Sequence, residues 1–375
     1  MTIRTAFEMT LLEILRKRDL AAVAILSVLF YAFYYPAPYS TQVVERLPIA
    51  VVDLDHSAAS RATLNLLHAA DAVTVVARPS DLSAARRLMR TRDVEGVLII
   101  PRGFGTLSAP ARPGAGIALW LNGAYLLRAE AVGKSVAEAV AATVDLHFAT
   151  SADERKIRPA AIAAHPLFNT TQGYRDYVFP AIANVILQQT LLFAVARLVA
   201  ERRRLNRWVG GIRPLIGVWA AATTIGTLAG LLYFGLVFWL QDIPHGGNIP
   251  ALLFTVPLFA ATVSGLAITI GCHVRSGDAA LKLLLPTSIP IVFVTGFAWP
   301  LAAMPGWVRA VAWTIPATPA THIFVPLNQM GASLGEVAPA VLILLAQCVV
   351  FATTAIAGST LPATARRGDS ATRLG

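Results

Sequence analysis

The sequence predicts a polytopic α-helical membrane protein with six transmembrane helices and an α/β extracytoplasmic domain inserted between the first and second spans. Of its 375 residues, 56% are hydrophobic and only 14% are charged, whereas a soluble domain normally carries about a quarter charged residues. The uncharged residues form long runs, and each run reaches the ~20 residues that a membrane-crossing helix needs. Charges return between residues 45 and 176, which indicates one sizeable water-exposed insertion.

Six segments that follow the uncharged runs predict the transmembrane helices: 20–38, 178–199, 215–240, 250–273, 282–300 and 337–358. A further uncharged run, 310–335, contains Pro316, Pro319 and Pro326. Irregular backbone is not tolerated where it faces lipid, and a seventh span would place the arginine-rich C-terminus outside the cytoplasm. We therefore expect a broken or re-entrant outer segment here rather than a spanning helix.

The net charge of +10 indicates topology rather than a nucleic-acid partner, because of where the basic residues lie. They precede the first span, lie between the second and third spans and between the fourth and fifth, and follow the last. The connection 241–249 contains no Lys or Arg, and 301–336 contains only Arg309. By the positive-inside rule, both termini are cytoplasmic and the insertion faces outward.

The predicted organisation has five parts: a cytoplasmic interfacial helix at 1–19, a first transmembrane helix at 20–40, an extracytoplasmic α/β domain at 41–176, a five-helix transmembrane region at 177–358 with an outer re-entrant hairpin near 296–335, and a cytoplasmic tail at 359–375. In the first part, apolar residues recur at roughly helical spacing among charges, which suits a helix lying on the inner membrane surface. A plain cytoplasmic extension of the first span is an equal alternative.

Strand-like and helix-like stretches alternate within the insertion. Strands are predicted at 49–55, 72–78, 96–101 and 116–123, and helices at 58–70, 82–93 and 125–149. Ser57 is positioned to cap the first of these helices, and Ser80 or Asp81 the second. This alternation predicts an α/β domain with a largely buried sheet.

The stretch "DLDHSAAS" resembles the D-x-D start of haloacid-dehalogenase phosphotransferases, in which the first carboxylate is the nucleophile. The predicted topology places Asp53 and Asp55 outside the cytoplasm, away from a cytosolic phosphate donor, and Ser57 stands where that motif prefers Thr or Val. Carboxylates near a helix N-terminus commonly accept backbone N–H groups. We therefore predict a structural role for both residues.

Two further patterns are excluded as catalytic motifs. "RAEAVGKSV" supplies Gly133, Lys134 and Ser135 of a phosphate-binding loop, but Arg128 occupies the first glycine position and the stretch lies mid-helix. The seven histidines show neither H-E-x-x-H nor any i, i+4 pair. We therefore predict a non-catalytic protein with no metal site and no cofactor.

Polar residues inside the second span are unfavourable in hydrocarbon and should face other helices or a water-filled path. They are Asn184, Gln188 and Gln189. Both alternatives, a translocation path and a helix interface, remain open.

The basic connection 200–214 also has two interpretations. Its arginines either fix topology and contact anionic membrane lipid, or they dock a cytosolic subunit.

Nearly the whole chain resembles the permease subunit of ABC exporters of the second type (ABC-2), in the form with a large extracytoplasmic insertion. Four stretches carry the resemblance, in the right order: "IAVVDLDHSAASR", "SAARRLMRTRDVEGVLIIPRGF", "LFNTTQGYRDYVFPAIANVILQQ" and "FVTGFAWPLAAMPGWVRAVAWTIPATPATHIF". One departure is Thr170 in "LFNTT", where the family pattern has proline.

The resemblance implies a permease of the bacterial inner (plasma) membrane that moves a substrate outward. ATP would be hydrolysed by separate cytosolic P-loop ATPase subunits, and a second permease copy or a paralogous permease would complete the path. A periplasmic adaptor is a further partner at family level. A mostly apolar interior with a few amides fits an amphipathic, drug-like or lipid-like substrate.

The resemblance also implies two sites. Residues that follow the second span would contact the ATPase: Glu201, Arg202, Arg203, Arg204, Arg207 and Trp208. The outer hairpin would shape the exit of the path, with Gly296, Pro300, Pro305 and Trp307.

Two other classes of function were weighed. A membrane-anchored sensor with an extracytoplasmic ligand-binding domain is the main alternative, but it requires a cytoplasmic output domain and no cytoplasmic stretch exceeds about twenty residues. A membrane-embedded enzyme requires paired ionisable groups within the spans, and the sequence shows none.

Overall fold

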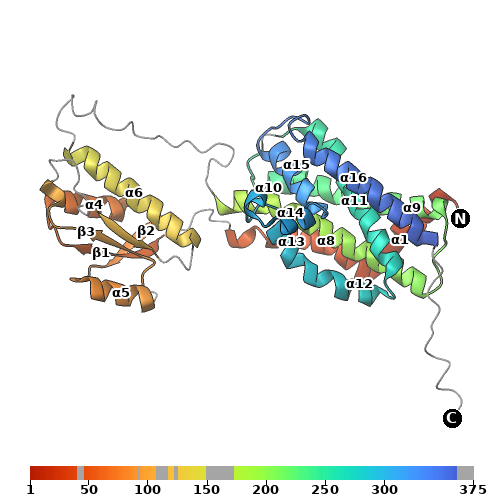
Figure 1. Cartoon of the computed structure of the whole chain (residues 1–375), viewed down its shortest axis with the longest axis horizontal. Helices are drawn as coiled ribbons and strands as arrows, with labels where there is room; N and C mark the ends of the chain where they lie inside the picture. The colour runs from red at the N-terminus through yellow and green to blue at the C-terminus, as the bar shows by residue number, and fades with distance from the viewer. Residues whose placement is uncertain are drawn as a thin grey trace, which may run out of the picture. The chain divides into compact units, whose positions relative to one another are not determined.

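The computed structural model describes residues 1–39, 46–91, 93–106, 117–121, 126–148, 173–245 and 247–360. The chain divides into two compact units. One, the helical unit, comprises Met1–Ser40 and Pro166–Gly375; the other, the α/β unit, comprises Thr41–His165. Figure 1 shows helices alone in the first and helices with strands in the second.

The helical unit contains six helical segments that are long and apolar enough to cross a membrane. They are Arg18–Tyr39, Tyr174–Arg204, Ile212–Leu240, Ile249–His273, Gly277–Val294 and Ala338–Thr360. Each coincides with one predicted span, so the prediction of six transmembrane helices is confirmed for the described part of the chain.

These segments are built from named elements. The first span consists of α2 (Arg18–Ala21), a π-helical turn (Ala22–Leu26) and α3 (Ser27–Tyr34). The second is α8 (Tyr174–Arg204), and the third is α9 (Ile212–Leu231) with a π-helical turn (Leu232–Val237) and α10 (Phe238–Leu240). The fourth is α11 (Ile249–His273), the fifth is α12 (Gly277–Leu284) with α13 (Ser288–Val294), and the sixth is α16 (Ala338–Thr360).

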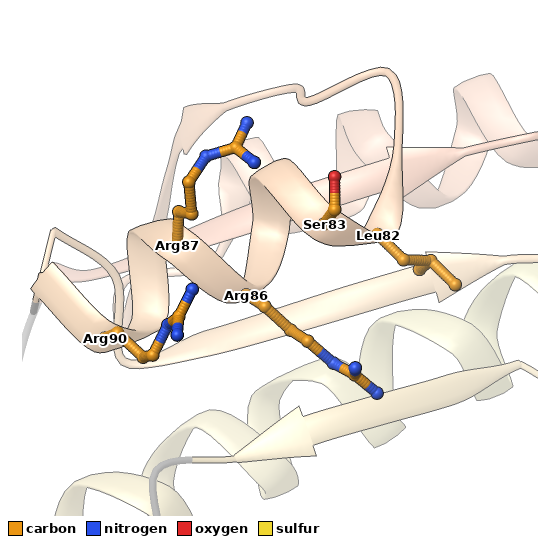
Figure 2. Close-up of a pocket in the computed structure, with 5 residues that line it drawn as sticks. All are labelled: Leu82, Ser83, Arg86, Arg87 and Arg90. Atoms are coloured by element: carbon orange, nitrogen blue, oxygen red, sulfur yellow. The ribbon is translucent and has the colours of Figure 1, made fainter.

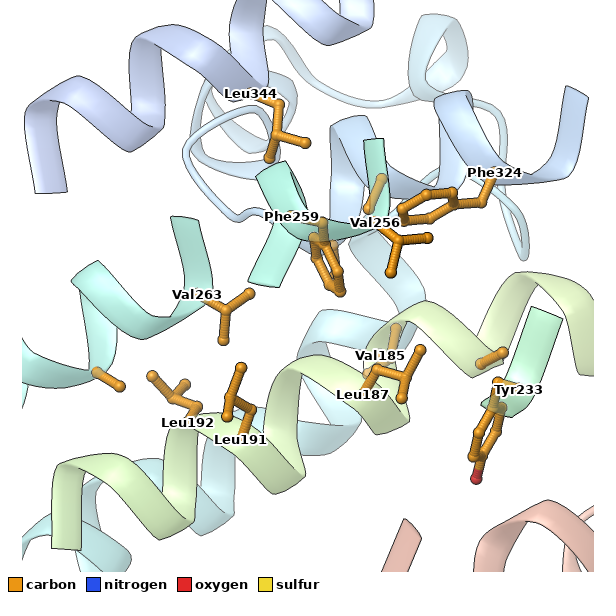
Figure 3. Packing of buried hydrophobic residues seen from close by; sticks show 14 of the residues in the cluster. Val185, Leu187, Leu191, Leu192, Tyr233, Val256, Phe259, Val263, Phe324 and Leu344 are labelled. Atoms are coloured by element: carbon orange, nitrogen blue, oxygen red, sulfur yellow. The ribbon is translucent and has the colours of Figure 1, made fainter. Parts of the chain in front are cut away.

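The helix α8 forms the core of the helical unit. In its apolar stretch 89% of the residues are buried, compared with 22% in the fifth span. Figure 3 shows Leu191 and Leu192 of α8 packed toward Phe259 and Val263 of α11. Association of helices in lipid depends on such close packing, because lipid tails are as apolar as the side chains themselves.

Two predicted boundaries differ from the structure. The insertion was expected to extend to residue 176, but α8 begins at Tyr174. The fifth span was expected at 282–300, but α12 begins at Gly277, where the Ser276 hydroxyl accepts the Ala279 N–H at 3.1 Å. This span ends before Gly296, whose φ of +93° is incompatible with continued helix.

The proline-rich segment after the fifth span is broken into short pieces: a 3₁₀ turn (Leu301–Ala303), α14 (Gly306–Ala312) and α15 (Ala317–Gln329). The 13 residues of α15 extend only about 20 Å, which is short of the ~30 Å hydrocarbon core. The α15 helix is nevertheless buried against α8 and α11. The expectation of a broken segment instead of a seventh span therefore agrees with these helix lengths.

The N-terminal helix α1 (Ile3–Arg16) is separate from the first span. Lys17 between them has extended backbone, with φ −81° and ψ 114°. One face of α1, with Ala6 and Ile14, is buried, while Met9, Leu12 and Leu15 on the opposite face are 45–54% exposed. The break fits a separate amphipathic helix better than an extension of the span.

The α/β unit contains a four-stranded sheet of order β2-β1-β3-β4. The strands are β1 (Leu47–Asp53), β2 (Val73–Ala77), β3 (Gly96–Ile100) and β4 (Ala118–Leu121). β1 pairs in parallel with β2 and β3, and β4 is antiparallel to β3. The central strands, β1 as far as Val52 and the whole of β3, are apolar because both faces of the sheet are covered.

Two helices cover one face of this sheet and one helix covers the other. On the first face, α4 (Ala58–Ala69) and α6 (Leu126–Phe148) bury Leu67 and Val132 against Ile49 and Leu98. On the second, α5 (Leu82–Thr91) buries Ala85 over Val52 and Val97. Ser57 caps α4, since its hydroxyl accepts the Ser60 N–H at 3.1 Å, and Asp81 caps α5 by accepting the Ala84 N–H at 2.8 Å.

Gly217→Ala is expected to loosen α1 from α9. A Cβ at this position would lie 2.4 Å from the Ile3 carbonyl oxygen and 2.5 Å from the Ala6 Cβ. The backbone of α1 would have to move, and overpacking of this kind typically costs about 1–3 kcal/mol. Faster tryptic cleavage at Lys17 in the solubilised protein would report the loosening.

Gly235→Ala is the matched control, because nothing lies within 4 Å of a Cβ built there. Indistinguishable cleavage rates at Lys17 in the two variants would contradict the packing of α1 on α9.

Candidate functional site

The C-terminal end of α8 lies where three other elements of the helical unit meet. The Trp208 indole donates to the Ser359 carbonyl of α16 at 3.2 Å, and Arg203 donates to the Gly358 carbonyl at 3.4 Å. The Gly277 N–H of α12 lies 3.5 Å from the Glu201 carboxylate. We call this region the basic end; its charged residues include Arg16, Lys17, Arg18, Arg202, Arg203, Arg204 and Arg207.

The opposite end of the same unit has different contacts. The Tyr177 hydroxyl donates to the Phe297 carbonyl, and the Gln329 amide donates to the Asp176 carbonyl at 2.8 Å. The Asn248 amide donates to the Ala332 carbonyl at 3.0 Å. The basic connections that alternate in the sequence are thus gathered at one end of the helical unit.

A buried ion pair joins α1 to α8 at the basic end. The Arg202 guanidinium is 8% exposed, and its Nε and Nη2 lie 2.8 and 2.7 Å from Glu13 Oε2. Its Nη1 donates to the Thr10 hydroxyl at 2.9 Å, and Lys17 Nζ lies 2.5 Å from Glu13 Oε1. A buried guanidinium is tolerated only with such a partner.

The Glu13 carboxylate remains ionised at neutral pH. Burial alone would raise its pKa, but the hydrogen bond from Lys17 and the charge of Arg202 outweigh this effect, and the pKa is lowered below its ordinary value. Glu13 therefore supplies the negative charge that Arg202 requires.

The structure divides the predicted docking residues into two layers. Arg202 and Arg203 are buried and bonded to α1 and α16, whereas Arg204 and Arg207 are exposed. Arg204 pairs with Glu201 on its own helix, and the half-buried Trp208 is bonded to α16. Consecutive helical residues are rotated by about 100°, so three successive arginines cannot share one surface. The run of three arginines in the sequence is therefore enough to indicate that they point in different directions.

Residue patterns alone did not identify the partners of these arginines or the apolar part of the surface. Thr10 and Glu13 lie 192 and 189 residues away from Arg202 in the chain. Leu205, Val209 and Ile212 are 42–50% exposed beside Arg204 and Arg207. The exposed part of the basic end therefore combines positive charge with apolar side chains, which suits binding of another protein.

A cavity of about 240 Å³ opens between α1 and the connection 205–211. Its polar lining consists of Glu13, Lys17, Arg202 and Arg207, and Met9, Trp208 and Val209 contribute apolar surface.

The three amides of α8 contact other helices of the same chain. The Gln188 carbonyl oxygen accepts the Ala317 N–H at 2.7 Å, which satisfies an orphan donor at the start of α15. Asn184 donates to Thr321 at 3.4 Å, and Gln189 donates to Ser288 of α13 at 2.9 Å. Of the two alternatives for these residues, the geometry within this chain matches the helix interface.

The outer hairpin residues have distinct local roles. A Cβ on Gly296 would lie 2.9 Å from Leu301 Cγ and 3.1 Å from His322 Nε2, so the tight turn requires glycine in both space and φ. Pro300 precedes the 3₁₀ turn and Pro305 precedes α14. Trp307 is 74% exposed, as expected for an aromatic ring at a membrane–water boundary.

In the α/β unit, the oxygens of Asp53 and Asp55 are occupied by protein donors. Asp53 accepts the Asp55 and His56 N–H groups at 3.0 Å and the Ser60 hydroxyl at 2.9 Å. Asp55 accepts the Gly103 and Gly105 N–H groups at 2.7 and 2.9 Å. These bonds tie the end of β1 to α4 and to the turn after β3, and the predicted structural role agrees with them.

Helix α5 carries a shallow basic hollow of about 530 Å³ on the α/β unit, lined by Leu82, Ser83, Arg86, Arg87 and Arg90. Figure 2 shows Arg86 and Arg87 extending in opposite directions from the helix. The Arg86 guanidinium lies 5.0 Å from the centre of the Trp120 ring. The diverging arginines form an exposed basic face rather than an enclosed anion site.

The stretch that resembles a phosphate-binding loop lies in regular helix. Gly133 lies within α6, so its backbone N–H groups cannot form a phosphate-binding loop. No group of three or more His, Cys, Asp or Glu is placed to hold a metal ion among the residues that the structure describes.

Six helices long and apolar enough to cross a membrane, with an α/β unit inserted after the first, define the chain as a multi-pass membrane protein. The family described as ABC-2 family transporter protein matches residues 17–357. The chain therefore belongs to this family, which confirms the resemblance inferred from its motifs.

Curated relatives match over most of their length. The probable multidrug ABC transporter permease YbhR of Escherichia coli (strain K12) is 22% identical over 345 residues, covering 88% of this chain and 90% of that protein. The linearmycin resistance permease protein LnrN of Bacillus subtilis (strain 168) is 25% identical over 305 residues, covering 72% and 77% respectively. No solved structure matches the chain.

Removal of either partner of the Glu13–Arg202 pair is expected to destabilise the helical unit by about 2 kcal/mol. Each single change leaves a charge with reduced compensation at a largely buried site. The double variant Glu13→Ala/Arg202→Ala should lose less than the sum of the single variants. Denaturant unfolding of the solubilised protein in a double-mutant cycle measures this coupling, and additive losses would contradict a direct interaction.

Asp55→Asn is expected to change the acid sensitivity of the α/β unit. Burial raises the pKa of Asp55, but hydrogen bonds from Ser57, Gly105 and Gly103 together lower it by more. The net pKa is therefore below the ordinary 3.8. A lowered folded-state pKa means that the stabilisation is present above the ordinary value and is lost as pH falls through the folded-state value.

Hydrogen exchange of residues 46–60, measured from about pH 5 to pH 3, tests this expectation. The wild type should lose protection in the acidic part of this range, and Asp55→Asn should start less protected and change less. Parallel curves for the two proteins would contradict the role of the carboxylate.

Proposed function

We propose that the chain is the membrane-spanning permease subunit of an ATP-driven exporter in a bacterial inner membrane. The basic end faces the cytoplasm, both termini are cytoplasmic, and the α/β unit is extracytoplasmic. Membership of the ABC-2 family and the gathering of basic connections at one end of the helical unit support this orientation, since cytoplasmic loops are enriched in Lys and Arg. ATP is hydrolysed by separate cytosolic P-loop subunits, and a second permease copy or a paralogue completes the path.

The observation that carries the proposal is the layered structure of the basic end. Its exposed layer, Arg204, Leu205, Arg207, Val209 and Ile212, offers charge and apolar area to an ATPase subunit. Its buried layer, Arg202 and Arg203, connects that surface to α1 and α16. Movement of the bound ATPase would therefore be transmitted to three helices rather than to one flexible loop.

For the substrate, we propose an amphipathic, drug-like or lipid-like molecule. The names of two relatives, a probable multidrug permease and a linearmycin resistance permease, support this class. The apolar core around α8, with its few amides, is compatible with it. Gly296 and Trp307 at the opposite end would border the exit, and a periplasmic adaptor would meet the α/β unit.

Charge reversal of the exposed layer, Arg204→Glu with Arg207→Glu, is expected to reduce co-purification of the ATPase subunit several-fold, because a favourable charge pattern becomes repulsive. Both residues are exposed, so insertion and folding should persist. The measurement is a mild-detergent pull-down of the tagged chain from its native membrane, with quantification of bound P-loop proteins.

Arg86→Glu with Arg87→Glu is the matched control, because it makes the same change of charge on exposed residues of the α/β unit. ATPase recovery should match the wild type in this control. Equal recovery in both double variants would refute docking at the basic end, and capture of a kinase or regulator in place of an ATPase would favour a sensor.

A further inference from the structure

The cavity at the basic end has a polar floor and an apolar rim. Arg202 is 8% exposed and Val218 is 2% exposed, so they lie deep in the unit. Met1, Met9 and Val209 at the rim are 43–54% exposed. A ligand that fits this arrangement has a compact polar group attached to an apolar body.

The charges of the cavity favour an anion. Three basic residues and one acidic residue line it: Lys17, Arg202, Arg207 and Glu13. Glu13 is shared between Arg202 and Lys17, while Arg207 has no ion pair or side-chain hydrogen bond among the described residues. Within the described part of the chain, the Arg207 guanidinium thus faces an electropositive cavity without a counter-charge of its own.

The size of the cavity excludes enclosure of a whole lipid. At about 240 Å³ it is smaller than the roughly 300 Å³ at which sites for drug-sized ligands begin. It can take a phosphate-containing head group, and acyl chains would then lie outside against the apolar rim. The first span begins at Arg18, immediately after Lys17, so the cavity lies at the level of the membrane surface.

We propose that this cavity binds the head group of an anionic phospholipid. The phosphodiester contacts Arg207 and Lys17, the acyl chains lie along Met9 and Val209, and the lipid bridges α1 to the connection 205–211. Basic pockets beside membrane helices on the cytoplasmic side are suited to such head groups. The C-terminal residues 361–375 are a less suitable occupant, because Arg366, Arg367 and Arg373 make that segment basic. Arg207 and Val209 also belong to the exposed layer proposed for ATPase docking, so a bound lipid and a docked ATPase would share these two residues. The proposal depends on neither the identity of the ATPase nor that of the transported substrate.

The test uses the full-length chain, purified with any subunits that accompany it, in micelles containing phosphatidylglycerol and phosphatidylcholine in equal amounts. Native mass spectrometry counts the retained lipids. The wild type should retain phosphatidylglycerol in preference, and Arg207→Gln should reduce its retention about fivefold. Arg207→Lys should keep most of the preference, because the point charge remains.

Arg213→Gln is the control, since Arg213 is exposed at the start of α9, directly after this connection, but does not line the cavity. Equal losses in the Arg207→Gln and Arg213→Gln variants would mean diffuse attraction to the surface and would overturn the proposal. A second variant, Met9→Gln, keeps the charge and should reduce retention about threefold through the acyl chains. It provides the test if Arg207→Gln does not fold.

Two further outcomes would also overturn the proposal. Displacement of phosphatidylglycerol by millimolar inorganic phosphate would identify a soluble phosphate as the ligand. Absence of bound lipid specifically in the complex with a co-purified ATPase would show that protein fills the cavity.

Discussion

The burial of the Arg202 guanidinium is the constraint on which the basic end depends. A cation at this depth requires an ionised partner and further acceptors, because water cannot solvate it. Glu13 and Thr10 on α1 meet this requirement. They fix α1 to α8, although the two helices are far apart in the sequence. Because Arg202 faces α1, Arg204 on another side of α8 and Arg207 in the following connection remain exposed for a partner.

Much of the fold could be predicted from residue patterns because the cost of placing charge in hydrocarbon is local. Almost uncharged stretches such as 178–199 and 337–358 therefore correspond to α8 and α16. The same reasoning shows why 310–335 does not span: three prolines interrupt it, and α15 is limited to Ala317–Gln329. The boundaries were less accurate where capping decides them. Ser276 caps α12, which begins at Gly277, five residues before the predicted start at Lys282.

The candidate site could be predicted only in part, because burial of a charged residue depends on tertiary partners. The segment around 201–208 was predicted as one docking element, although the helical rotation of about 100° per residue already implied that Arg202, Arg203 and Arg204 diverge. Which of them turns inward depends on Glu13, a residue that a single sequence cannot pair with Arg202. The amides show the same limit of local information: Gln188 is recognisable as costly in a span, but its acceptor role at the start of α15 appears only when the two helices are adjacent.

The polar groups of α8 bind its neighbours at three depths. Arg202 and Arg203 connect it to α1 and α16 at the basic end. Gln188 and Gln189 connect it to α15 and α13 in the interior, and Asp176 and Tyr177 connect it to the segments around Gln329 and Phe297 at the opposite end. With 31 residues, α8 is a rod of about 46 Å, so a displacement of its basic end is carried through the bundle along with the helices bonded to it. In a low-dielectric interior, breaking these hydrogen bonds is costly, and movement of α8 together with α1, α15 and α16 requires fewer broken bonds than movement of α8 alone. A force applied at the exposed arginines would therefore reach the Gly296 turn through bonded side chains, which provides a physical route from ATPase docking to the proposed exit.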